Sequence, residues 1–202
     1  MIYSFPGQVF KCVFVIRNTS EGDHMPDANI TKRALSNSLK KKMQEKPFDK
    51  ISVIDICEGC GMNRKSFYYH FKDKYDLVNW IFYTDFILLA STRTYEDGWD
   101  LIHTLAEVFY QDREFYGCAL EIEGQNSFRD YFYESTMPIM NLFMQNLGSD
   151  EEQISINQRY MSDAFLAIMH RWLRSGKDQD PDVFVENLKL IISNLSARVS
   201  GQ

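Results

Sequence analysis

Apolar side chains recur every three to four residues through most of the chain, which is the spacing of one face of an α-helix. In the first half of the chain this repeat predicts helices at 31–45, 53–58, 64–71 and 74–93. Further on it predicts helices at 100–111, 115–122, 127–147, 152–175 and 181–197. The pattern therefore predicts an all-α fold.

Polar residues suited to helix caps mark the starts of the early helices. Thr31, Ser52, Asn63 and Asp73 each precede an apolar repeat, and the glycine-containing run 59–61 breaks the second helix. Two short helices joined by a tight glycine turn form a helix-turn-helix, whose second helix enters the major groove of DNA. We therefore expect a three-helix DNA-binding domain, joined by a helix to a helical C-terminal domain.

The start of the third predicted helix carries cations where the helix dipole disfavours them. Arg64 and Lys65 occupy its first turn, and an anionic partner would compensate for their placement. Arginine can bind guanine with two hydrogen bonds, and lysine can reach bases or phosphates. Tyr68, Tyr69 and His70 follow, and Lys74 lies at the next helix start, where backbone N–H groups also attract phosphate.

The run from Gly61 to Leu77, GMNRKSFYYHFKDKYDL, resembles the signature of TetR-type transcriptional regulators, and the likeness covers about 50 residues. It departs from the usual pattern at Cys57 and Cys60, where small apolar residues are common, and in its more basic Arg64–Lys65 pair. The resemblance implies that Phe67, Phe71 and Leu77 belong to the core. It also implies a set of DNA-contacting positions: Arg64, Lys65, Ser66, Tyr68, Tyr69, His70 and Lys74.

The distribution of charge separates two parts of the chain. Residues 29–82 hold 11 Lys and Arg against 6 Asp and Glu, whereas residues 83–202 hold 9 against 19. A basic segment of this kind suits a polyanionic partner. We interpret 29–76 as the helix-turn-helix domain and 77–202 as the effector-binding and dimerisation domain. Residues 1–28 are expected to be an N-terminal arm, disordered or non-native, because Met25 makes a natural start.

The resemblance implies a homodimer, in which the last two long helices pair with those of a second copy. The ordinary alternative is an intramolecular core, and helical periodicity alone does not separate the two. A twofold dimer implies a palindromic double-stranded DNA operator. The residues expected at the dimer contact are apolar: Ala164, Phe165, Ile168, Trp172, Leu188, Ile191, Ile192 and Leu195.

An effector is expected to shift the population between DNA-binding and non-binding arrangements, with the helix at 74–93 as the lever. The expected mechanism is a repressor released by a small molecule. The alternative is an activator controlled by a partner protein, because stretches at 124–131, 171–176 and 181–184 resemble a subgroup that includes the activator of dihydroxyacetone kinase genes. The candidate pocket residues, each of which also suits plain core, are Trp99, His103, Phe115, Tyr116, Phe143 and His170.

The pair Cys57 and Cys60 offers the competing chemistry, because a C-x-x-C motif can be a redox dithiol or half of a zinc site. The helical pattern on both sides favours structural cysteines, with a thiol redox protein as the alternative function. No second ligand pair accompanies the motif, so we expect no metal and no cofactor. Glu121 and Glu123 lack a nucleophile or phosphate loop beside them, so no catalytic residues and no enzyme are predicted.

Composition fits these expectations. Four cysteines in 202 residues suit a reducing cytoplasm better than a disulfide scaffold. The longest apolar runs fall well short of the about 20 residues that cross a bilayer. We therefore expect a cytoplasmic protein with no membrane partner.

Overall fold

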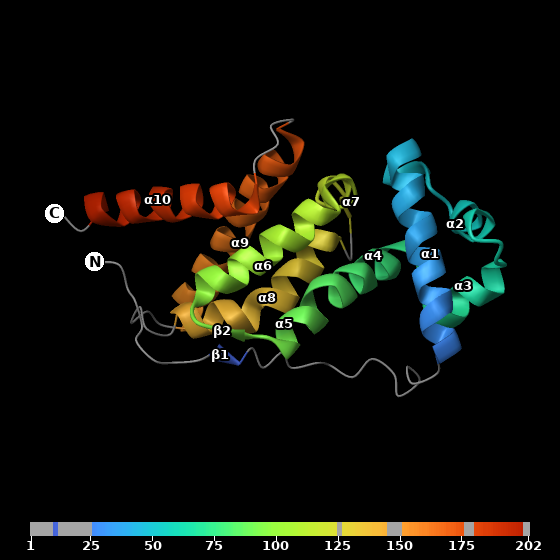
Figure 1. Ribbon diagram of the computed structural model, residues 1–202, viewed down its shortest axis with the longest axis horizontal. Coiled ribbons are helices and arrows are strands. Elements are labelled where there is room, and N and C mark those ends of the chain that lie inside the picture. Colours follow the sequence, from blue (N-terminus) through green and yellow to red (C-terminus); the bar gives the residue numbers. More distant parts are fainter. Residues whose placement is uncertain (1–9, 12–25, 125–126, 145–150, 176–179, 200–202) are drawn as a thin grey trace.

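The computed structural model describes residues 10–11, 26–124, 127–144, 151–175 and 180–199, and within these ranges the side chains of 10–11, 26–27, 138–144, 151–158 and 195–199 lie outside that description. Helices α1 (Pro26–Glu45), α2 (Val53–Gly59) and α3 (Arg64–His70) gather at one end of an elongated molecule (Figure 1). Together with α4 (Lys74–Phe82) they form what we call the head. The other helices form the body: α6 (Gly98–Gln111), α7 (Arg113–Ala119), α8 (Phe128–Met144), α9 (Glu151–Arg174) and α10 (Pro181–Val199).

The short helices of the head begin at side-chain caps, as the sequence predicts. Ser52 and Asp55 form a reciprocal capping box, in which each side chain accepts a hydrogen bond from the other residue's backbone N–H. Asn63 caps α3 by accepting a hydrogen bond from the backbone N–H of Ser66, and Asp73 caps α4 by accepting from those of Tyr75 and Asp76. Between α2 and α3, Gly61 has φ of 69°, a left-handed conformation that glycine adopts without steric cost.

A tight contact holds α2 against α1. Gly59 faces Ser38, and a Cβ at Gly59 would collide with the Ser38 hydroxyl. That hydroxyl donates a hydrogen bond of 2.7 Å to the backbone oxygen of Ile56. Phe67, Phe71 and Leu77 are buried beside α1, which confirms their expected place in the core. The head is thus a packed unit in which α3 has a fixed inner face.

Phe82, at the end of α4, joins the head to the aromatic core of the body. Its ring centroid lies 5.3–6.2 Å from five other rings, those of Phe86, Phe109, Phe128, Tyr131 and Phe132. Around this cluster α8 and α7 pack against α9, and α10 packs against α6. None of the described helices is long and apolar enough to cross a membrane.

The helix predicted at 74–93 contains an irregularity that apolar spacing does not reveal. After α4 the chain makes a π-helical segment, η2 (Tyr83–Ile87), and then α5 (Leu88–Thr92). The Thr84 hydroxyl donates to the backbone oxygens of Trp80 and Ile81, at 3.0 Å each. Such bonds back to the preceding turn compete with the regular helical pattern.

The N-terminal region also differs from the prediction. Helix α1 begins at Pro26, so Thr31 lies inside the helix instead of capping it. Proline suits a first helical turn because its missing N–H would be unpaired there anyway. Strand β1 (Phe10–Lys11) pairs antiparallel with β2 (Thr94–Tyr95). Part of the arm predicted at 1–28 therefore belongs to defined elements.

Candidate functional site

Helix α3 presents a polar and aromatic face to solvent. Its cap, Asn63, accepts a hydrogen bond of 2.9 Å from the backbone N–H of Ser66. This cap starts the helix at Arg64, so Arg64 and Lys65 stand exposed on its first turn. Phe67, further along the same helix, is fully buried. The burial of Phe67 fixes which side of α3 faces outward.

The two tyrosines of α3 are both exposed, Tyr68 by 51% and Tyr69 by 83%. The guanidinium carbon of Arg64 lies 5.7 Å from the ring centre of Tyr68, one turn further along the helix. His70 is half-buried and meets the Tyr69 ring edge-on at 4.9 Å. Six of the seven predicted DNA-contacting residues thus lie on one short helix, with Ser66 half-buried.

Lys74, the seventh, is engaged inside the head. Its ammonium donates hydrogen bonds of 2.7 and 2.8 Å to the backbone oxygens of Phe48 and Ile51. It also lies 4.3 Å from the ring centre of Phe48. Burial lowers the pKa of Lys74, against the opposing effect of Asp49. Lys74 thus holds the short 3-10 helix η1 (Phe48–Lys50), a role that its position in the sequence motif does not reveal.

The cysteine pair has the surroundings of structural thiols. Cys57 is buried, and the thiol of Cys60 donates to the backbone oxygens of Ile56 and Cys57, at 3.4 Å each. Both cysteines are free, and burial raises the pKa of each thiol. A raised pKa disfavours the thiolate that redox chemistry needs. The described residues contain no group of three or more metal-ligating side chains.

The expected effector residues whose side chains are described lie in several parts of the body. Trp99 and His103 face α10, where Lys189 lies near the Trp99 ring and Asp182 contacts His103. Phe115 and Tyr116 are buried core residues. The Phe143 side chain lies outside the described part. His170 lines a cavity together with residues from other segments.

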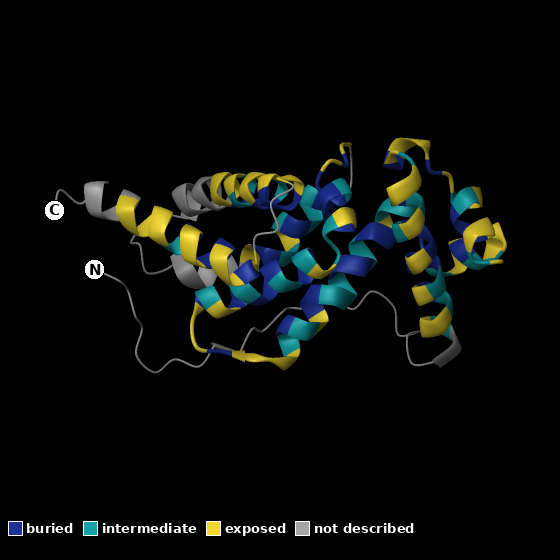
Figure 2. Cartoon of the chain, turned by 45° about the horizontal axis from the view of Figure 1, so that its top comes forward, coloured by how far each residue is buried: buried dark blue, intermediate teal, exposed yellow. Residues whose placement is uncertain are grey.

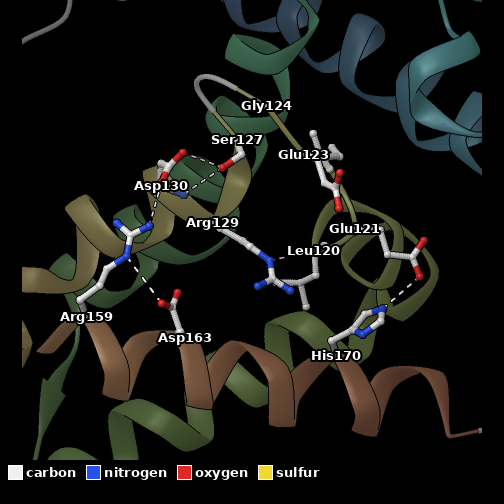
Figure 3. Close-up of a pocket in the computed structure, with 11 residues that line it drawn as sticks. Leu120, Glu121, Glu123, Gly124, Ser127, Arg129, Asp130, Arg159, Asp163 and His170 are labelled. Atoms are coloured by element: carbon white, nitrogen blue, oxygen red, sulfur yellow. Dashed lines mark hydrogen bonds and ion pairs between the residues drawn. The ribbon is translucent and has the colours of Figure 1, made fainter. Parts of the chain in front are cut away.

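That cavity, of about 650 Å³, opens between the end of α7, the start of α8 and the middle of α9 (Figure 3). Arg159 pairs with Asp130 and Asp163, while His170 pairs with Glu121 at 3.0 Å. The described lining combines charged and polar side chains with two apolar ones: Leu120, Glu121, Ile122, Glu123, Gly124, Ser127, Arg129, Asp130, Arg159, Asp163 and His170. Sequence reasoning missed most of it, because these residues come from three separate segments.

Within this cavity, Arg129 differs from the other cations. Its Nε donates a hydrogen bond of 3.2 Å to the backbone oxygen of Leu120. Figure 3 shows the rest of its guanidinium directed into the space above α9. The cavity thus contains the Arg129 guanidinium beside two sets of paired side chains. Arg159 is paired with Asp130 and Asp163, and His170 is paired with Glu121.

The residues expected at the dimer contact divide into two groups. Trp172 and Leu188 are buried, and Trp172 stacks on Phe184 at 4.2 Å, so they join α9 to α10 within one chain. Phe165 is half-buried and stacks on Phe132. The side chain of Leu195 lies outside the described part. The exposed members are Ala164, Ile168, Ile191 and Ile192.

Further apolar residues, which the sequence analysis missed, lie exposed near these four. On α9 and α10 they are Tyr160, Met161, Val183 and Leu190. Figure 2 shows the exposed residues running along both helices. The signal was present in the helical spacing of 160, 164 and 168, but the same spacing also describes a buried face.

Comparison with known proteins gives matches in both parts of the chain. Residues 40–81 match the family described as "Bacterial regulatory proteins, tetR family". Residues 97–194 match the tetR-type family described as "Transcriptional regulator C-terminal region".

One curated relative is the HTH-type dhaKLM operon transcriptional activator DhaS of Lactococcus lactis subsp. lactis (strain IL1403). It is 32% identical over 95 residues, covering 44% of this chain and 51% of the relative, so the match spans about half the relative's length. A solved structure titled "Dihydroxyacetone kinase operon activator DhaS" matches with a TM-score of 0.58 and 23% identity. It covers 83% of this chain and 97% of that one, and its likeness concerns the fold. With both of its parts matched, the chain belongs to the tetR family of bacterial transcriptional regulators.

Proposed function

We propose that the chain acts as a homodimer that binds a palindromic DNA operator and controls transcription of neighbouring genes. The observation that carries this proposal is the orientation of α3, which buries Phe67 and turns Arg64, Lys65 and Tyr69 outward. A helix with this exposed face suits the major groove, where side chains from its first turn reach base edges. Because bacterial DNA lies in the cytoplasm, we also propose that the protein acts there.

Each residue of this face has a distinct role in the proposal. Arg64 binds a guanine edge, where its fork of donors matches two acceptors. Lys65 and Ser66 contact bases or phosphates, and the hydroxyls of Tyr68 and Tyr69 together with His70 donate to phosphates. Lys74 holds the loop at residues 48–51 and adds positive charge near the DNA backbone.

The test is binding to the DNA upstream of the chain's own gene, followed by fluorescence anisotropy at several salt concentrations. We expect specific binding that weakens steeply as salt rises, because lysine and arginine displace counterions from DNA. Arg93→Ala is the matched control for Arg64→Ala, because Arg93 is an exposed arginine outside the head. Equal affinity for this DNA and for random sequence would contradict the proposal.

For the dimer, we propose that the exposed apolar faces of α9 and α10 meet those of a second copy. Leu190 and Ile191 are more than half exposed, and burying such side chains favours association. Leu190→Glu is expected to give monomers in analytical ultracentrifugation and to abolish specific DNA binding. Ile30→Glu places the same charge on an exposed apolar residue of α1 and should leave the dimer intact. A monomeric wild-type protein would overturn this part.

For the regulation of DNA binding, we propose that a small molecule or a partner protein binds the body at the cavity lined by His170 and Arg129. Release of a repressor is the primary mechanism, and activation is the second, favoured by the name of the related operon activator. Deleting the gene distinguishes repression from activation. Transcription of the adjacent genes rises if the protein represses and falls if it activates.

A further inference from the structure

Lys40 lies on the side of α1 that faces the body, within a run of three lysines at 40–42. Its ammonium is 2.7 Å from a carboxylate oxygen of Asp112, at the junction of α6 and α7. It is also 3.0 Å from a carboxylate oxygen of Asp85, in the π-helical segment η2. One cation thus binds α1 to two carboxylates, one in η2 and one where α7 of the body begins.

This contact is shielded from water more than a typical surface ion pair. The side chains of Lys40, Asp112 and Asp85 are 21%, 29% and 35% exposed. The ammonium also lies 5.2 Å from the ring centre of Phe115. Burial alone would lower the pKa of Lys40, but the hydrogen bond to Asp112 and the charge of Asp85 outweigh it and raise the pKa. Lys40 therefore stays charged when it is in place.

The body holds Asp85 from its other side through Tyr116. The Tyr116 hydroxyl donates a hydrogen bond of 3.2 Å to the same Asp85 oxygen that binds Lys40. Tyr116 is fully buried and stacks on Phe109 at 4.1 Å. The Asp85 carboxylate is thus tied to the aromatic core of the body while it binds the head.

The backbone that carries Asp85 is itself unusual. A π-helical turn holds one more residue than an α-helical turn, and such turns occur often at functional sites in proteins. A change in this turn would move Asp85 relative to both Tyr116 and α1. The geometry of η2 therefore sets where Asp85 lies between Tyr116 and α1.

We propose that Lys40 is a positioning residue: by binding α1 to Asp85 and Asp112, it sets the orientation of α3 relative to the body. This concerns the geometry within one chain, so it goes beyond the proposed function. Lys40 touches no DNA in this role and acts through the placement of α1. Lys42, two residues further along α1, binds Glu45 of its own helix and has no such role in the proposal.

The direct test measures the distance between a spin label at Glu58 in the head and one at Glu96 in the body. Labels carried by unnatural amino acids leave the four cysteines in place, and excess unlabelled protein restricts the readout to one chain. We expect a narrow distance distribution for the wild type and a broader or shifted one for Lys40→Met. Lys42→Met is the matched control and should keep the narrow distribution, while Lys40→Arg should restore it.

DNA affinity, measured on unlabelled protein, gives a second readout. Lys40→Met is expected to lose about tenfold in affinity for the operator relative to random DNA, within the usual range of coupling between distant sites. Its salt dependence should stay unchanged, because no phosphate contact is lost. A reduced salt slope would instead assign Lys40 to the DNA backbone and would overturn the positioning role.

Asp112→Asn keeps the inference testable if Lys40→Met does not fold. It removes the charge of the closer partner and should broaden the same distance distribution. Combined with Lys40→Met in a folded double variant, it should add little, because both changes remove one interaction. An unaltered distance distribution in folded Lys40→Met or Asp112→Asn would overturn the proposal, even with DNA binding intact. Conversely, absence of any operator would overturn the proposed function and leave the distance result standing.

Discussion

The head and the body of this chain are built in different ways. In the head, short helices begin at Ser52, Asn63 and Asp73, and each cap lies within three residues of the backbone groups it binds. In the body, long helices surround an aromatic cluster centred on Phe82. The geometry of the head thus follows from short stretches of sequence, whereas that of the body depends on contacts between distant residues.

The largest expected effect comes from removing the ring that the two regions share. Phe82→Ala should lower the free energy of unfolding by about 3–5 kcal/mol, because a buried ring is lost and a cavity remains. Urea denaturation followed by circular dichroism measures this. Tyr69→Ala, which removes a ring that is 83% exposed, is the comparison and should change stability little. Equal losses in the two variants would contradict the assigned burial.

Arg64→Ala should separate binding from stability. We expect a loss of about 1–3 kcal/mol in discrimination between the operator and its base-substituted variants, as for an arginine that binds guanine. The free energy of unfolding should hardly change, because Arg64 is exposed. Competition binding with substituted operators gives the first value and urea denaturation the second. If Arg64→Ala weakened binding to all sequences alike, Arg64 would be a phosphate contact instead.

Gly61→Ala tests the turn that orients α3. Alanine at a φ of 69° costs roughly 1–2 kcal/mol in the left-handed region. Because nothing else lies within 4 Å of an added Cβ there, the cost arises in the local backbone and not from contact with surrounding residues. Thermal unfolding should show the loss, with Gly124→Ala, at another positive φ, as a comparison in the body. A variant as stable as the wild type would show that the turn relaxes.

The smallest effect concerns acid stability of the cap on α2. Hydrogen bonds from Ser52, followed by one from the Lys46 ammonium, hold the pKa of Asp55 well below its usual range. A carboxyl with a depressed pKa stabilises the fold above its unfolded pKa of about 3.9, and this contribution is lost as pH falls below that value. The melting temperature of Asp55→Asn should therefore fall less than that of the wild type between about pH 5 and 3. If the melting temperatures of the two proteins fell equally over this pH range, the Asp55 carboxylate would not contribute to acid stability.

Much of the head could be predicted from sequence because its signals are local. Three caps, the glycine turn and the outward face of α3 all follow from residues close together in the chain. Lys74 is the exception, since its carbonyl partners lie 23 to 26 residues earlier. A motif indicates which type of residue occurs at a position, but not which distant backbone atoms it binds.

In the body, sequence periodicity locates helices without showing which face is covered. Trp172 and Ile168 are one turn apart on α9, yet one is buried and the other is 41% exposed. Phe115 and Tyr116 suit a pocket and a core equally well by residue type, and the packing of α7 decides for the core. The π-helical segment left no trace in apolar spacing, because a single extra residue in one turn hardly alters a period of 3.6.

The uneven charge of the chain acquires a direction from the elongated shape in Figure 1, where the head occupies one end. With a net +5 over residues 29–82 and −10 over residues 83–202, the molecule has an electric dipole along its length. In the field of a nucleic acid, this dipole turns the basic end forward before contact and repels the acidic end. Encounters in which the acidic end faces the nucleic acid are thereby disfavoured before the protein contacts any base.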